Sequence, residues 1–198
     1  ADLSVKEERQ KLFDYTTSNH MIVENLINNA GFGNADAYLD TPWELHKNMV
    51  DINVVALMHL SHLYGNEMKK RRKGRILNVA SVAAFSAGPY MSVYYASKAF
   101  VFSLSQAMYE ELKGYGVSVT VLCPGPTGTN FENTAGLTNS KMFKVFGVEK
   151  ADSVVKRGYK GMMRGKAIVY HSKVTYGFNI ITRLVSRKCA RNIAGRIN

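Results

Sequence analysis

The sequence has little cysteine, proline and tryptophan: 2, 4 and 1 residues, respectively, among 198. The two cysteines, Cys123 and Cys189, show no metal-ligand spacing, which argues against a disulfide scaffold and predicts reduced thiols in a cytoplasmic protein. No apolar run approaches the ~18 residues that cross a bilayer, so no membrane span is expected. The first twenty residues are polar and charged, and they carry no visible secretory signal.

A glycine-rich phosphate-binding turn is also missing from the sequence. The 16 glycines are scattered, and no Gly-x-x-x-Gly-x-Gly pattern joins a strand to a helix. In dinucleotide-binding folds such a turn holds the pyrophosphate at a helix N-terminus. The first residue is Ala1 rather than Met, and we therefore expect a fragment or a processed product.

Positive charge is in excess, with 26 lysines and arginines against 15 acidic residues and a net charge of +11. Much of it falls in residues 69–73 and in the tail at residues 183–196. Such clusters can bind nucleic acid or anionic lipid. No aromatic platform or reader motif accompanies either cluster, so no nucleic-acid partner is expected. The first cluster is interpreted as the end of a helix, where cations offset the helix dipole.

Short apolar segments alternate with longer amphipathic ones along the chain. Strands are predicted over residues 25–31, 75–81, 117–123 and 167–170. Helices are predicted over residues 4–20, 42–70, 91–113 and 151–163, followed by a basic helical tail at 174–198 that breaks near residue 186. This alternation, with strands that are apolar throughout, indicates a single α/β domain over residues 1–198 with a doubly wound parallel sheet.

Local signals suggest where some of these elements begin and end. Residues 1–4 are expected to end a strand, and Ser4 with Glu7 has the spacing of a capping box that opens the first helix. The strand at residues 25–31 is expected to be buried. Pro42 is expected to begin the second helix and Gly74 to end it.

Polar segments follow three of the predicted strands. These are Asn28–Gly31, Ser81 and Pro124–Thr129. In open parallel sheets the binding site lies at the carboxyl ends of the strands. The three segments are therefore expected to meet at one edge of the sheet.

A tyrosine and a lysine four residues apart, Tyr94 and Lys98, would share one helix face beside Ser81. A phenol, an ammonium and a hydroxyl that converge are suited to reversible carbonyl reduction. The ordinary tyrosine pKa of about 10 would have to fall to roughly 7–8 for efficient proton exchange near neutrality. We expect the charge of Lys98 to lower it by that amount.

Two other patterns are weaker. Tyr109 and Lys113 have the same spacing, but two glutamates follow Tyr109, and the pair is interpreted as solvated helix surface. His59 and His62 are spaced like a metal-binding pair on a helix, yet no third ligand is evident, and no metal is expected.

Taken together, the motifs resemble the classical short-chain dehydrogenase/reductase family. The matching segments, in order, are Asn28-Asn29-Ala30-Gly31, Asn53, Ser81, Tyr94-x-x-x-Lys98 and Pro124-Gly125-x-x-x-Thr129. The resemblance spans about residues 1–170 and implies a Rossmann-like fold. It also implies an NAD(P)-dependent oxidoreductase that reduces a carbonyl or oxidises an alcohol by hydride transfer.

The resemblance implies a role for each matched residue. Tyr94 would be the catalytic acid/base, Ser81 would orient the carbonyl, and Lys98 would bind the ribose and tune the phenol. Asn53 would support a proton relay through water. The residues implied to bind the cofactor are Asp2, Asn29, Ala30, Gly31, Tyr94, Lys98, Pro124, Gly125, Thr127 and Thr129. The cofactor is NAD or NADP, with NADP slightly favoured.

The sequence departs from the family at its beginning. The family starts with a strand, a Thr-Gly-x-x-x-Gly-x-Gly turn and a helix, and this N-terminal βαβ portion is absent. We therefore expect a truncated piece of a longer enzyme, in which the strand with Leu26 and Ile27 is an open apolar edge. The alternatives are a catalytically inactive interaction or regulatory protein on the same scaffold and, third, a nucleic-acid binder.

The segment at residues 129–148 would set the substrate in this family, and its residues indicate an apolar small-molecule carbonyl or alcohol. The apolar residues are Phe131, Leu137, Met142, Phe143 and Phe146. The helices that correspond to residues 42–70 and 91–113 often pack across a two-fold axis in the family. A homodimer or homotetramer is therefore expected by resemblance.

Overall fold

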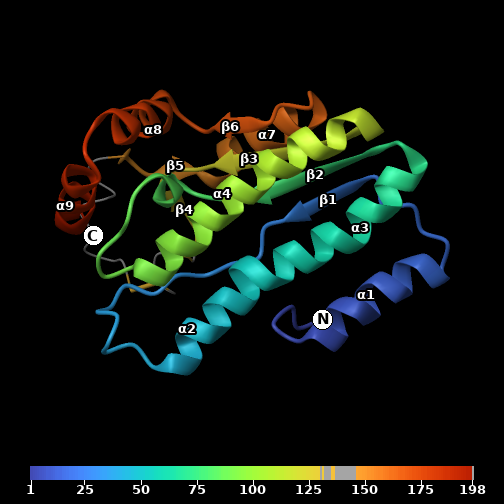
Figure 1. Cartoon of the computed structure of the whole chain (residues 1–198), viewed down its shortest axis with the longest axis horizontal. Coiled ribbons are helices and arrows are strands. Elements are labelled where there is room, and N and C mark those ends of the chain that lie inside the picture. Colours follow the sequence, from blue (N-terminus) through green and yellow to red (C-terminus); the bar gives the residue numbers. More distant parts are fainter. Residues whose placement is uncertain (130, 132–134, 137–145, 198) are drawn as a thin grey trace.

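Four parallel strands form the central sheet of the computed structural model, which describes residues 1–129, 131, 135–136 and 146–197 (Figure 1). The strands are β1 (Asn25–Asn28), β2 (Gly74–Val79), β3 (Val117–Cys123) and β6 (Ile168–Tyr170), in the spatial order β1-β2-β3-β6. Ile76 of β2 is level with Leu26 of β1 and with Val119 of β3. The predicted α/β class with a parallel sheet is confirmed.

Helices cover both faces of this sheet (Figure 1). One face carries α1 (Lys6–Ser18), α2 (Trp43–Val50), a π-helical segment (Asp51–Ala56), α3 (Leu57–Arg71) and α4 (Ser92–Leu112), and the other carries α7 (Ala151–Met163). Ile76 and Val119 pack with Met68 of α3 on the first face. Leu77 and Leu122 point the other way and pack against α7. The doubly wound arrangement therefore follows from the alternation of apolar side chains along β2 and β3.

Shorter elements complete the chain. They are two 3₁₀ turns (Val82–Phe85 and Lys113–Tyr115), the paired strands β4 (Thr127–Gly128) and β5 (Glu149–Lys150), and the final helices α8 (Lys173–Leu184) and α9 (Arg187–Ile197). No helix in these described ranges is long and apolar enough to cross a membrane.

The helix predicted over residues 42–70 begins as expected after Pro42 but is not regular. Its backbone widens into the π-helical segment Asp51–Ala56, which carries Asn53. Such π-turns are rare and concentrate at functional sites. The helix then ends at Arg71, and the residue that follows it, Arg72, takes the left-handed conformation (φ 53°) that was expected of Gly74. Gly74 is instead the first residue of β2.

The predicted beginning of the chain is also corrected. Residues 1–4 form a turn and no strand. Ser4 does not cap α1, because Val5 is the capping residue and the Ser4 hydroxyl donates to the Asp2 carboxylate (2.8 Å). The capping position is thus one residue later than the spacing predicted, and α1 begins without a side-chain cap.

Strand β1 is less buried than its apolar sequence indicated. It lies at the edge of the sheet, as expected, and 51% of Ile27 is exposed. Its inward-facing residue Asn28 is buried. A strand with one neighbour and one covered face exposes its remaining side chains to solvent.

Candidate active site

Ser81 and Tyr94 meet at the carboxyl end of β2. Ser81 follows the strand by two residues and begins a 3₁₀ turn, where its hydroxyl accepts a hydrogen bond from the Ala83 N–H (3.1 Å). Tyr94 lies in the first turn of α4 and is 8% exposed. The side chains of Ser81 and Tyr94 are hydrogen-bonded to each other. The structure thus brings together the two hydroxyls that the sequence predicted to converge.

Lys98 lies one turn further along α4 and is also buried. Its Nζ donates to the Val79 carbonyl (2.9 Å) and lies 5.8 Å from the centroid of the Tyr94 ring. Burial lowers the pKa of Lys98 to about 8. The ammonium therefore keeps its proton at neutral pH, and only one of its three N–H donors is used by this hydrogen bond.

The expected lowering of the Tyr94 pKa is wrong for this structure. Burial raises the pKa of Tyr94 to about 12, and the hydrogen bond with Ser81 opposes that rise without overcoming it. The ammonium of Lys98 is directed to a backbone carbonyl and not to the phenol oxygen. The desolvation of the phenolate is therefore the dominant effect.

Asn53 joins the loop after β1 to helix α4. Its Nδ2 donates to the Phe32 carbonyl (2.8 Å) and the Ser97 hydroxyl (3.1 Å), and its Oδ1 accepts from the Phe32 N–H (3.0 Å). The Ser97 hydroxyl in turn donates to the Tyr94 carbonyl (2.7 Å). Both amide hydrogens are thus engaged. The second lone pair of Oδ1 is left to accept a hydrogen bond from the water of a proton relay.

The loop after β1 passes close to these groups. A Cβ on Gly31 would lie 2.8 Å from Asn53 Oδ1 and 3.3 Å from Lys98 Nζ, so glycine permits this approach. Asn29 and Ala30 are exposed beside it at the end of β1. Gly33, which the sequence did not single out, lies against the ring of Tyr94. A Cβ at this position would lie 3.2 Å from Tyr94 Cδ2.

The Pro124–Thr129 segment reaches the same edge of the sheet. The Pro124 carbonyl accepts from the Val82 N–H (2.8 Å), directly after Ser81. The Thr127 hydroxyl donates to the Gly125 carbonyl (3.0 Å), and the Thr129 hydroxyl accepts from the N–H two residues on (3.2 Å). These threonines therefore shape the loop through their own backbone.

Asp2 is not brought to this site by any contact in the described part of the chain. Its carboxylate accepts from the N–H and the hydroxyl of Ser4 at 2.9 and 2.8 Å. These hydrogen bonds lower its pKa, the bond to the Ser4 backbone most strongly. The predicted contact of Asp2 with an adenine stays a prediction.

A buried polar ladder, Ser61–Asn28–Asn78–Ser105, was not found by sequence reasoning. Asn28 Nδ2 donates to Asn78 Oδ1 (2.8 Å) and Ser61 Oγ (2.9 Å), and Asn78 Nδ2 donates to Ser105 Oγ (2.9 Å). It crosses from α3 through β1 and β2 to α4. Asparagines in the middle of apolar strand segments were the signal that could have revealed it.

The apolar residues expected to contact a substrate are only partly described. Phe131 packs on Tyr94, with ring centroids 5.3 Å apart, and Phe146 packs on Phe178 at 5.2 Å. Leu137, Met142 and Phe143 lie outside the described residues.

The two weaker sequence patterns, Tyr109 with Lys113 and His59 with His62, make contacts within the fold. Lys113 pairs with Glu110, whereas Tyr109 is partly buried against the core around Met68, so its interpretation as solvated surface is wrong. His59 Nδ1 accepts from Arg9 (3.3 Å). The described residues contain no group of three or more His, Cys, Asp or Glu side chains placed to hold a metal.

Comparisons with known proteins identify the family of the chain. The family model described as short chain dehydrogenase matches residues 1–140. "Probable oxidoreductase EphD" of Mycobacterium tuberculosis is 32% identical over 136 residues, which cover 68% of this chain and 23% of that protein. The 7beta-hydroxysteroid dehydrogenase of Collinsella aerofaciens is 37% identical over 90 residues, covering 46% of this chain and 34% of that one.

A solved structure shows the same fold. The short-chain dehydrogenase from Sphingobium yanoikuyae, in complex with NADPH, is 25% identical with a TM-score of 0.79, covering 93% of this chain and 72% of that chain. The matches to the two curated relatives span only about a quarter and a third of their lengths. Because the family model matches most of its length, the chain belongs to the short-chain dehydrogenase family.

Proposed function

We propose that this chain carries the proton-transfer centre of an NAD(P)-dependent oxidoreductase that reduces an apolar carbonyl compound to an alcohol. The observation that carries the proposal is the buried group at the carboxyl end of β2. There the Ser81 and Tyr94 hydroxyls are hydrogen-bonded, and the Lys98 ammonium is held one helical turn away. The membership of the family supports the same chemistry.

Each side chain has a defined part in the reduction. Tyr94 holds its proton at neutral pH, because burial raises its pKa to about 12, and it donates that proton to the developing alkoxide oxygen. Ser81 donates a hydrogen bond to the same oxygen and stabilises its growing negative charge. Lys98, still charged below a pKa of about 8, stabilises the phenolate that Tyr94 leaves behind.

The residues around this group fit a nicotinamide cofactor. Two N–H donors of Lys98 are available for a ribose hydroxyl, and Gly31 keeps the space beside the ammonium open. Asn29 and Ala30 are exposed at the end of β1, where they would contact the adenosine half, and the Pro124–Thr129 loop would contact the nicotinamide half. When bound, NADH or NADPH supplies the hydride.

Substitution of Tyr94 tests the proposal. The protein is incubated with NADPH or NADH and a panel of apolar ketones, including a steroid ketone because one relative is a hydroxysteroid dehydrogenase, and loss of the reduced nicotinamide is followed. Tyr94→Phe is expected to abolish turnover, whereas Tyr109→Phe, with the same Tyr-x-x-x-Lys spacing, leaves it unchanged. Full activity of Tyr94→Phe would refute the proposed role.

A second function is favoured by one observation. Tyr94 is only 8% exposed and is covered by Phe131. If the unsubstituted protein turns over no ketone and binds neither nucleotide, the chain is instead a catalytically inactive interaction protein on this scaffold. Binding of NADPH, measured by calorimetry, separates the two functions.

We also propose that two copies associate through α4. An apolar groove of about 560 Å³ lies between the end of α2 and α4. Val50 and Phe100, on its rim, are 40% and 41% exposed. Exposed apolar grooves between long helices are suited to a partner helix. Phe100→Asp is expected to convert a dimer to a monomer in sedimentation equilibrium, and an unchanged mass would contradict this interface.

A further inference from the structure

Helix α8 buries two polar side chains and exposes five apolar ones. Thr175 and Asn179 are 1% and 3% exposed, and Asn179 Nδ2 donates to the Tyr170 hydroxyl (2.7 Å). The exposed apolar residues on the other side, which we term the α8 stripe, are Val174, Tyr176, Ile180, Ile181 and Leu184. Leu184 is 81% exposed. A helix on the surface of a soluble domain has the reverse pattern, so this stripe is built for an apolar contact.

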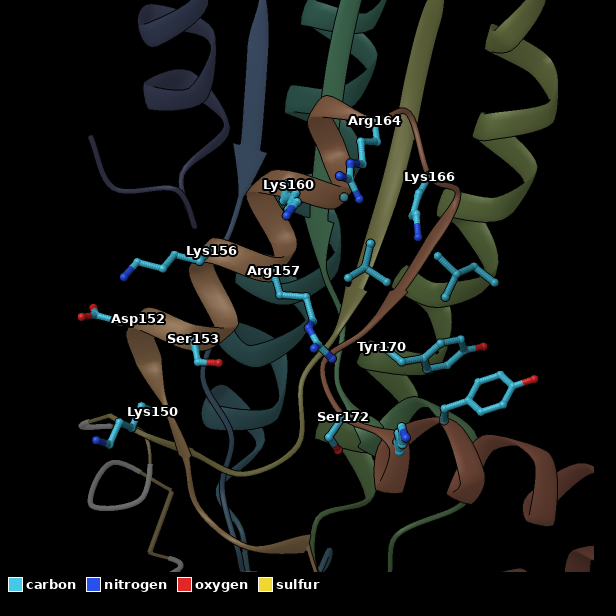
Figure 2. A pocket seen from close by; sticks show the side chains of 15 residues that line it. Lys150, Asp152, Ser153, Lys156, Arg157, Lys160, Arg164, Lys166, Tyr170 and Ser172 are labelled. Atoms are coloured by element: carbon cyan, nitrogen blue, oxygen red, sulfur yellow. The ribbon is translucent and has the colours of Figure 1, made fainter.

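A cationic groove adjoins the α8 stripe. It lies between α7, β6 and the start of α8, and its volume is about 980 Å³ (Figure 2). The cations that line it from α7, β6 and their flanking residues are Lys150, Lys156, Arg157, Lys160, Arg164 and Lys166. Lys173 and Tyr176 of α8 line the same groove, so the stripe and the groove share one face of the molecule. Asp152 is the one carboxylate on the lining among the residues that the structure describes.

The charges of this groove are not neutralised within the described part of the chain. The other basic cluster differs, because Lys70 pairs with Glu67 and Lys73 with Glu24, each at 2.7 Å. No ion pair is found for the seven groove cations among the described residues. Seven cations against one carboxylate create a local field that attracts an anionic surface.

We propose that the cationic groove and the α8 stripe together form a face that binds an anionic phospholipid bilayer. The stripe enters the boundary between headgroups and acyl chains, and the lysines and arginines of the groove contact the lipid phosphates. An apolar helix face bordered by basic side chains is the pattern of a helix that lies on a membrane surface.

A second copy of the chain fits this face less well than a bilayer does. A two-fold contact that covered both the stripe and the groove would bury the seven cations of each copy in one interface, and like charges within an interface oppose association. An anionic bilayer offers the opposite charge together with an apolar interior. The face is independent of the catalytic proposal, because it uses none of the residues assigned to catalysis.

Co-sedimentation with vesicles tests the proposal. The unsubstituted protein is expected to bind vesicles of phosphatidylcholine with phosphatidylserine, and to bind pure phosphatidylcholine vesicles much less. Each groove lysine removed is expected to lower the partition coefficient roughly fivefold, so Lys156→Gln with Lys160→Gln lowers it about twenty-five-fold. The matched control, Lys69→Gln with Lys70→Gln in the other cluster, leaves binding unchanged.

The apolar half of the face has its own control. Leu184→Ser is expected to lower binding about tenfold, whereas Leu39→Ser, which changes a leucine that is 90% exposed elsewhere, has no effect. All six side chains substituted in the groove and stripe tests and their controls lie on the surface, and circular dichroism checks that each variant folds. Equal binding to both vesicle types, or binding indifferent to these variants, would overturn the proposal.

A fluorescent probe distinguishes a bilayer from a second copy. Trp43, the single tryptophan, lies at the start of α2 and is expected to show no change in emission on addition of vesicles. In the Trp43→Phe background, Tyr176→Trp is expected to shift its emission to shorter wavelength only when anionic vesicles are present. A shift that instead follows protein concentration without vesicles would assign the face to self-association and refute membrane binding.

Discussion

Lys98 is predicted to lower the stability of the folded protein at neutral pH. Its pKa is about 8 in the folded state against an ordinary 10.5, because burial disfavours the ammonium. At pH 7 both states are protonated, and this difference corresponds to about 3 kcal/mol of destabilisation. Replacement by methionine removes that cost but leaves the Val79 carbonyl without its donor, which costs about 1–2 kcal/mol. Lys98→Met is therefore expected to be more stable than the unsubstituted protein by about 1–2 kcal/mol while losing reductase activity.

The pH dependence of this difference is the sharper measurement. The unfolded chain binds more protons at Lys98 than the folded chain between the two pKa values, so the stability of the unsubstituted protein rises with pH across that window. Urea denaturation of both proteins at about pH 7 and about pH 10 should show the advantage of Lys98→Met shrinking or reversing at the higher pH. A variant that is less stable at pH 7, or a difference independent of pH, would refute the reasoning.

Three further substitutions have matched controls or direct structural causes. Gly74→Ala should lower the free energy of unfolding, measured by urea titration, by about 2–3 kcal/mol, because its Cβ would lie 2.3 Å from Cγ of the buried Met68. Gly114→Ala is the control and should be neutral or slightly stabilising, because no atom lies within 4 Å of the added Cβ. Asn28→Ala should cost about 2–3 kcal/mol by opening the buried polar ladder, and the exposed Asn66→Ala should cost under about 0.5 kcal/mol. Gly31→Ala should reduce kcat about 100-fold, because the added Cβ would displace Asn53 or the loop after β1. An unchanged kcat would show that the close approach of residue 31 to Asn53 is not needed for turnover.

Most of the fold could be predicted from the sequence because its signals are local. The strand at 117–123 and the helix at 151–163 were predicted with the bounds that the structure has. Gly116 ends the preceding helical segment with φ +71°, a conformation that glycine adopts without strain. One error lies at Ser4, where a local contact with Asp2 competes with the capping pattern, and another lies at Gly74, where packing against Met68 decides the structure. Met68 fills the space above Gly74, and no local pattern around residue 74 indicates that.

The candidate site was predicted in part. Side chains one turn apart on a helix, such as Tyr94 and Lys98, are placed together by helix geometry alone. The sequence could not show that Lys98 donates to a carbonyl of β2, because that partner is nineteen residues away in the chain. The π-turn around Asn53 and the cover of Phe131 over Tyr94 also depend on packing between distant segments.

By itself, the sequence determined the α/β class, because apolar strand segments alternate with amphipathic helical ones, and it predicted which polar segments follow the strands at one edge of the sheet. Only the tertiary structure decided how those groups ionise and which surface remains uncovered. The pKa of Tyr94 rises instead of falling because burial is a property of the whole fold, and desolvation exceeds the opposing hydrogen bond with Ser81. In the same way, the cations on and beside α7 and at the start of α8 form one groove because the fold brings together residues 150–173, which the sequence shows as separate charges.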